Sequence, residues 1–157
     1  MKKIFIALLL FVVFQSFTSC SNNGVTEPEE IGEQVFEILK NITTDSKQEY
    51  FENFLSVESG TKEYFSSLTS EEYYEKMDKN YNRIKAEAGE TGIKWKEIEY
   101  LDFTYRINSG DVGKECWGEL FFQYDNTSYS IKTRSFFYKN TYRLTNIYDL
   151  DRYKKID

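Results

Sequence analysis

The sequence predicts an α+β fold in which N-terminal helices pack on an antiparallel sheet of at least four strands. Two observations predict it. Between positions 28 and 88 apolar residues recur every three or four positions, as on one face of a helix, whereas from Ile93 to Leu150 apolar and polar residues alternate, as in strands. Short polar links separate the alternating runs, and parallel strands would need longer crossovers, so the pairing is expected to be antiparallel.

Two helices are expected first. Pro28 suits the first turn of one helix, and Asp45 or Ser46 begins the next with a capping box. Their apolar stripes consist of Ile31, Val35, Ile38, Leu39 and Ile42, and of Tyr50, Phe51, Phe54 and Leu55.

A third, longer helix follows. Thr69 and Glu72 form the capping box at its start, and Gly89 and Gly92 are expected to end it, because glycine readily leaves the helical conformation. Its stripe consists of Tyr73, Met77, Tyr81, Ile84 and Ala88.

The sheet is predicted as a meander whose last two turns are Asn126-Thr127 and Lys139-Asn140. With these turns, every inward side chain of one strand lies opposite an inward side chain of the next. A slip of one residue would turn a whole strand to the other face, so this agreement supports the alignment. The alternation of Leu101, Phe103, Tyr105 and Ile107 adds the first strand.

Composition excludes several functions. The chain has 157 residues, of which 40% are hydrophobic, which suits one domain over 28–157. A net charge of −6 argues against a nucleic-acid partner. Histidine is absent, which removes the commonest metal ligand and the commonest general base near neutral pH. The remaining carboxylates lack the spacing of a calcium loop, and neither a metal site nor another cofactor is expected.

The first twenty residues are expected to be a signal peptide. A basic start precedes an apolar run of eleven residues from Ile4 to Phe14, too short for a stable transmembrane helix. Phe17-Thr18-Ser19-Cys20 then resembles the lipobox of bacterial lipoproteins. This resemblance implies that a diacylglyceryl group is attached to Cys20, followed by a polar tether over 21–27. The protein is therefore expected in the cell envelope as an outer-membrane lipoprotein that faces the periplasm or the cell surface.

The order of elements also carries a resemblance. Helices followed by an antiparallel sheet, from Pro28 to Leu150 and including the last strand Tyr142–Ile147, resemble the nuclear-transport-factor-2-like (cystatin-like) fold. In particular, the chain is similar to small Bacteroidetes-type lipoproteins with such a domain of unknown function. The resemblance implies a cone in which the helices cover a curved sheet. A plain cystatin-like domain or another α+β roll is the alternative.

The inward face offers a ligand-pocket hypothesis. Polar side chains stand where apolar ones are expected, and buried polar groups need partners, which a ligand can supply. The pocket candidates are Thr133, Ser135, Asn146 and Tyr124. The alternative is close packing, with Phe103 filling the space above Gly118. Cys116 on this face is expected to be a small buried hydrophobe rather than a nucleophile.

An enzyme is the runner-up interpretation. Glu99 is expected on the inward face near Tyr148, and acids and tyrosines inside the cone carry catalysis in enzymes of the resembled fold. Glu97 shares this face with Glu99, and a bulge near Glu97 would place both acids in water instead.

The opposite face offers an interface hypothesis. Trp117, Phe136 and Arg143 are expected in one row, with Phe121 beside it, and aromatic residues with arginine are typical of binding hot spots. The partner would be an envelope protein or a second copy of the chain. Alternatively, other segments of the chain cover this face.

These features predict a lipid-anchored envelope protein that binds, through either a ligand in the cone or a protein on the open sheet face. Catalysis is the second interpretation. An inhibitor or immunity-type lipoprotein, which blocks an enzyme by surface contact, also fits the acidic charge and the aromatic face.

Overall fold

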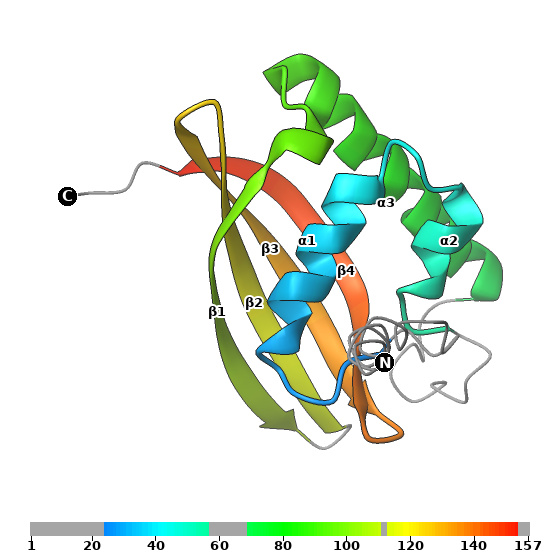
Figure 1. Cartoon of the computed structure of the whole chain (residues 1–157). Coiled ribbons are helices and arrows are strands. Elements are labelled where there is room, and N and C mark those ends of the chain that lie inside the picture. Colours follow the sequence, from blue (N-terminus) through cyan, green and yellow to red (C-terminus); the bar gives the residue numbers. More distant parts are fainter. Residues whose placement is uncertain (1–23, 57–68, 111–112, 154–157) are drawn as a thin grey trace, which may run out of the picture.

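The computed structural model describes residues 24–56, 69–110 and 113–153, with side chains up to Asp151. The predicted signal peptide and most of the tether lie outside these residues. The elements are α1 (Glu30–Asn41), α2 (Lys47–Glu52), α3 (Ser70–Thr91), a 3₁₀ turn η3 (Trp95–Glu97), β1 (Glu99–Gly110), β2 (Gly113–Tyr124), β3 (Thr127–Tyr138) and β4 (Thr141–Tyr153). The strands form one antiparallel sheet in the order β1-β2-β3-β4, which confirms the α+β class and the meander (Figure 1).

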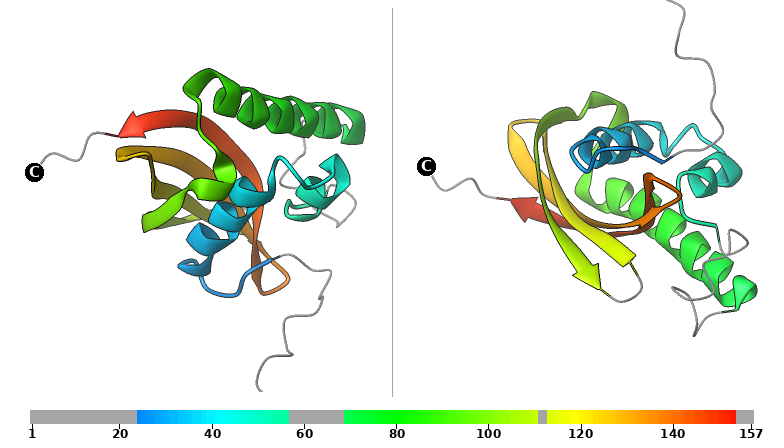
Figure 2. Two further views of the ribbon diagram at one scale, coloured as in Figure 1. Left: turned by 45° about the horizontal axis from the view of Figure 1, so that its top comes forward. Right: turned by 90° about the horizontal axis from the view of Figure 1, so that it is seen from below.

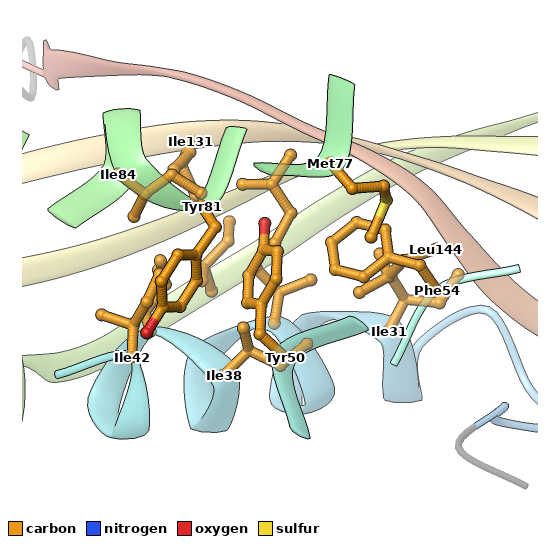
Figure 3. Packing of buried hydrophobic residues seen from close by; sticks show 14 of the residues in the cluster. Ile31, Ile38, Ile42, Tyr50, Phe54, Met77, Tyr81, Ile84, Ile131 and Leu144 are labelled. Carbon is orange, nitrogen blue, oxygen red and sulfur yellow. The ribbon is translucent and has the colours of Figure 1, made fainter. Parts of the chain in front are cut away.

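The sheet curves around α1. This helix packs against β1, β2 and η3, whereas α3 packs against β4 and α2 packs against α3 (Figure 2). One cluster of buried side chains fills the space between the helices and the sheet, and the predicted helical stripes supply much of it. Figure 3 shows the meeting of α1 (Ile31, Ile38), α3 (Met77, Tyr81, Ile84) and the sheet (Ile131, Leu144).

Both predicted capping boxes form. Ser46, rather than Asp45, begins α2: its hydroxyl accepts a hydrogen bond from the Glu49 N–H, and the Glu49 carboxylate accepts one from the Ser46 N–H. Thr69 and Glu72 make the same reciprocal pair at the start of α3. Each box satisfies main-chain donors that a helix leaves free at its first turn.

Two helix ends differ from the prediction. α3 continues through Gly89 and ends at Thr91, because the next residue, Gly92, adopts the left-handed conformation (φ 74°). α2 ends at Glu52, so Phe54 and Leu55 are buried in extended chain and not in a helix. The Leu55 N–H instead donates to the Leu144 carbonyl at 2.8 Å, because the edge of β4 offers an acceptor there.

One predicted turn is wrong by one residue. The turn between β2 and β3 is Asp125-Asn126, not Asn126-Thr127, and both of its residues have positive φ (46° and 58°). Asp and Asn tolerate this conformation, whereas a β-branched Thr does not. The correction moves the pairing of β2 with β3 by two residues, so every side chain stays on its predicted face. Lys139-Asn140 forms the second turn as predicted.

β-Bulges change the face of several residues. An irregularity between Tyr100 and Asp102 places Tyr100 opposite Phe122, so Glu99 lies opposite Gln123 on the outer face. In the pairing of β3 with β4, an irregularity between Arg134 and Ser135 places Ile147, rather than Asn146, opposite Thr133. The inward positions predicted for Glu99, Asn146 and Tyr148 are therefore wrong, because each bulge adds one residue to one strand only.

Phe103 is clamped between two glycines. A Cβ atom on Gly32 of α1 would lie 2.5 Å from the Phe103 Cβ and Cγ atoms, and one on Gly118 of β2 would lie 2.2 Å from its Cζ atom. Because neither glycine has a side chain, α1 approaches the sheet closely enough to hold the ring between them. Phe103 fills the space above Gly118, as the close-packing alternative predicted, although its partner in the pairing is Leu120.

Candidate functional site

The outer face of the sheet carries a connected group that we call the Trp117 platform: Glu115, Trp117, Arg134 and Tyr148. The Glu115 carboxylate holds two of its neighbours. Its Oε2 atom accepts a hydrogen bond from the Trp117 Nε1–H at 3.1 Å, and its Oε1 atom accepts one from Arg134 Nη2 at 2.6 Å. The Glu115 side chain is only 18% exposed, so this charged pair is partly shielded from water.

The rings and guanidinium groups of the platform are stacked. The Arg134 guanidinium lies 4.8 Å from the centre of the Trp117 ring, and the Tyr148 ring is nearly parallel to Trp117 with 6.1 Å between centres. Arg106 of β1 approaches the same indole to 6.0 Å. Cation–π attraction and the shared Glu115 restrict the rotamers of these side chains, so a partner would find the platform already ordered.

A hollow of about 350 Å³ lies beside the platform, over β1, β2 and β3. It is lined by Thr104, Tyr105, Arg106, Trp117, Gly118, Glu119 and Lys132. Both charge signs line it, and Glu119 also accepts a hydrogen bond from the buried Ser130 hydroxyl at 2.7 Å. This lining suits a polar or charged partner with an apolar group for the indole.

The predicted interface residues are only partly brought together. Trp117 lies opposite Arg134 rather than Phe136, because the pairing of β2 with β3 is displaced by two residues. Phe136 does lie opposite Arg143, but it is only 6% exposed and packs over Gly113.

Phe121 lies further along β2 than the platform and is half-buried. The prediction missed Glu115 and Arg106. The signal for Glu115 was present in its spacing, because a residue two positions before Trp117 shares its face of the strand.

The inward polar residues do not converge on one point. Thr133 lies between Gly118 and Ile147, and Ser135 lies between Cys116 and Leu144. Both residues are 1% exposed, and their hydroxyl oxygens have no hydrogen-bond partner among the described residues.

Of the two remaining pocket candidates, Tyr124 is partly buried against the core beside the turn into β3. Asn146 pairs with Arg134, and its Oδ1 atom accepts a long hydrogen bond (3.4 Å) from Asn80 of α3. These four side chains therefore do not line one space, and the volume above Gly118 belongs to Phe103.

The catalytic candidates are far apart. Glu99 is exposed and lies opposite Gln123, whereas Tyr148 stacks on Trp117. Gln123 and Trp117 are six positions apart along β2, so Glu99 and Tyr148 are separated by about 20 Å. Cys116 is 1% exposed, and its burial, with a smaller contribution from the charge of Glu29, raises the pKa of its thiol to about 11. The thiol therefore stays protonated at neutral pH and is a poor nucleophile.

A second hollow, of about 400 Å³, lies on the helical side. Its lining includes Phe51, Tyr73, Tyr74 and Met77, and it reaches Ser56, where the first described segment ends.

Two kinds of site are absent from the described residues. These residues contain no group of three acidic or cysteine side chains arranged to hold a metal ion. None of their helices has the length and apolar character needed to span a bilayer.

We compared the chain with models of protein families, with curated proteins and with solved structures, and none of the three comparisons produced a match.

Proposed function

We propose that this protein is a lipid-anchored binding protein of the cell envelope that engages a protein partner through the Trp117 platform. The observation that carries the proposal is that the Glu115 carboxylate accepts hydrogen bonds from both the indole of Trp117 and the guanidinium of Arg134 and so holds the two side chains in place. Tryptophan and arginine dominate the binding energy of many interfaces, and side chains that are already ordered lose little entropy on association. The hollow beside the platform would accept a side chain of the partner.

The platform supports this reading better than the interior supports a ligand. Phe103 occupies the space that a ligand in the cone would need, while the hollow on the outer face is open. The hydroxyls of Thr133 and Ser135, which have no hydrogen-bond partner within the described segments, favour an interior ligand as the second candidate. Helices on the inner side of a curved four-stranded sheet also support a nuclear-transport-factor-2-like cone as the fold family, which stays part of the proposal.

Replacing Trp117 with alanine is expected to preserve the fold and weaken partner binding by about 2 kcal/mol or more, the size of effect typical of a hot spot. Cross-linking in intact envelopes, followed by purification in detergent, would reveal partner bands that the wild type yields and Trp117→Ala loses. Tyr74→Ala is the control, because Tyr74 is an aromatic residue with an exposed side chain (38%) but lies on α3, away from the platform. Loss of the partner in Tyr74→Ala alone would place the site at the helical hollow and contradict the proposal.

The anchor is tested separately at Cys20. The lipobox-like Phe17-Thr18-Ser19-Cys20 supplies a thiol for acylation after an apolar run of eleven residues. Cys20→Ala is therefore expected to abolish incorporation of a fatty-acid probe during growth and to release the protein from membranes. Cys116→Ala, which leaves the lipobox intact, should be labelled as the wild type is. Undiminished labelling of Cys20→Ala would refute the lipoprotein assignment.

A further inference from the structure

The two edges of the sheet differ. Along β4 the main chain has partners from elsewhere in the fold: Val25 exchanges hydrogen bonds with Tyr142 (3.0 and 2.6 Å), and Leu55 and Arg83 each donate to a β4 carbonyl at 2.8 Å. In the described part of the chain β1 has β2 as its one neighbouring strand, and no backbone hydrogen bond from another described segment reaches it. β1 is twelve residues long and contains no proline, so its outer edge is a continuous template for another strand.

β1 also carries most of the exposed apolar surface. Of the five large apolar side chains that are exposed in the described part of the chain, four belong to β1: Tyr100, Leu101, Tyr105 and Ile107, at 38–46%. Asp102 and Arg106, of opposite charge, lie on the other face of the same strand. An edge strand with this composition resembles half of an interface, because single exposed apolar residues are common but a row of them on a free edge is not.

The direction of the main-chain groups follows from the pairing with β2. Gly110 and Gly113 form the closing pair of a hairpin with two residues between them, and such a pair is hydrogen-bonded. Alternate residues then face β2, which leaves the N–H and C=O groups of Phe103, Tyr105 and Ile107 directed outward. Consistently, the Phe103 N–H donates to the Asp102 carboxylate at 2.8 Å.

We propose that two copies of this chain pair through β1, antiparallel, about a two-fold axis at Thr104. In this arrangement Asp102 lies opposite the partner subunit's Arg106, and Phe103 lies opposite the partner subunit's Tyr105. Symmetry repeats each pair, so the interface gains two ion pairs. The outward groups of Phe103 and Tyr105 also become a hydrogen-bonded pair, as the ladder requires, when the Asp102 carboxylate exchanges the Phe103 N–H for the guanidinium of the partner subunit's Arg106.

The neighbouring alignments are less complementary. An axis at Phe103 would place Asp102 opposite the partner subunit's Thr104, and an axis at Tyr105 would place Arg106 opposite that same threonine. An axis at Arg106 would place two guanidinium groups opposite each other. Charged residues and the irregularity at Leu101 are also devices by which monomers protect a free edge. Here, however, the two charges are of opposite sign and symmetrically placed about Thr104, so they attract a second copy.

Pairing through β1 would produce a continuous eight-stranded sheet. Growth would stop at the dimer, because segments of the same chain cover much of the outward edge of β4. The inference goes beyond the proposed function, but it bears on the same surface. Thr104 and Arg106 line the hollow beside Trp117, so the two hollows of a dimer would meet across the axis.

A cysteine at the axis tests the geometry. In the full chain purified in detergent, Thr104→Cys is expected to form a reducible disulfide-linked dimer, because opposite Cβ atoms at such a position lie about 4.5–5.5 Å apart. Asn108→Cys is the matched control: it is exposed on the same strand, but its two copies would stand about 27 Å apart. The wild-type chain measures the background from Cys20 and the buried Cys116. The arrangement would be refuted if both variants cross-linked equally, or if Thr104→Cys formed no disulfide-linked dimer.

Charge reversal tests the register independently. Asp102→Arg and Arg106→Asp are each expected to weaken dimerisation about tenfold or more, measured by sedimentation equilibrium, because each turns two attractive pairs into two repulsive ones. The double variant Asp102→Arg/Arg106→Asp should restore the wild-type constant to within about threefold. A wild type that is monomeric at about 100 μM, or a double variant as weak as the single ones, would overturn the proposal. Partner loss in Trp117→Ala without a change in dimerisation would show that the two sites are independent.

Discussion

Phe122→Ala is expected to lower the free energy of unfolding by about 3–5 kcal/mol, because the removed ring is fully buried and leaves a cavity that its neighbours cannot fill. Phe122 is 0% exposed, and its ring centre lies 5.8 Å from that of Trp95 and 5.7 Å from that of Tyr129. It therefore joins η3 to two strands. Thermal and denaturant unfolding followed by circular dichroism would measure the loss.

The neighbouring residue is the control for this experiment. Phe121 has the same chemistry but points to the outer face and is half-buried, so Phe121→Ala is expected to cost only about 1 kcal/mol. Equal losses for the two variants, or an unchanged melting temperature for Phe122→Ala, would show that the face assignment of β2 is wrong.

Gly118→Ala is expected to destabilise the protein by about 1–3 kcal/mol, although it adds only a methyl group. That methyl carbon would lie 2.2 Å from the Phe103 Cζ atom and 3.0 Å from the Thr133 hydroxyl. The Phe103 side chain cannot simply move away, because its Cβ and Cγ atoms are already packed closely against Gly32 of α1. Equilibrium unfolding would measure the change.

A double variant separates this clash from other effects of the substitution. Phe103→Leu shortens the side chain, so Gly118→Ala should cost much less in a Phe103→Leu background than in the wild type. If the two substitutions were additive, the loss in Gly118→Ala would come from the strand itself and not from the clamp around Phe103.

Part of the Trp117 platform could be predicted from the sequence. Trp117 was expected on the outer face, and it lies there, because a two-residue error in the turn at Asp125-Asn126 leaves the faces of β2 and β3 unchanged. The side chains that contact Trp117 could not be predicted. Whether Trp117 meets Phe136 or Arg134 depends on that same two-residue displacement, which exchanges an aromatic pair for a cation–π contact.

The sequence by itself determined the element types and most of their faces. Apolar spacing defined the helices and strands, and capping boxes defined the start of α3 at Thr69 and narrowed the start of α2 to Asp45 or Ser46. These signals are readable because each depends on residues only a few positions apart in the chain.

Only the tertiary structure decided the places of Glu99, Asn146 and Tyr148, because a bulge depends on how two strands and the helix above them fit together. The irregularity before Asp102 moved Glu99 to the outer face, and the one between Arg134 and Ser135 in the pairing with β4 brought Tyr148 to Trp117. The clamp around Phe103 has the same origin: Gly32 and Gly118 are 86 positions apart in the sequence, and only the packing of α1 on the sheet brings both against one ring.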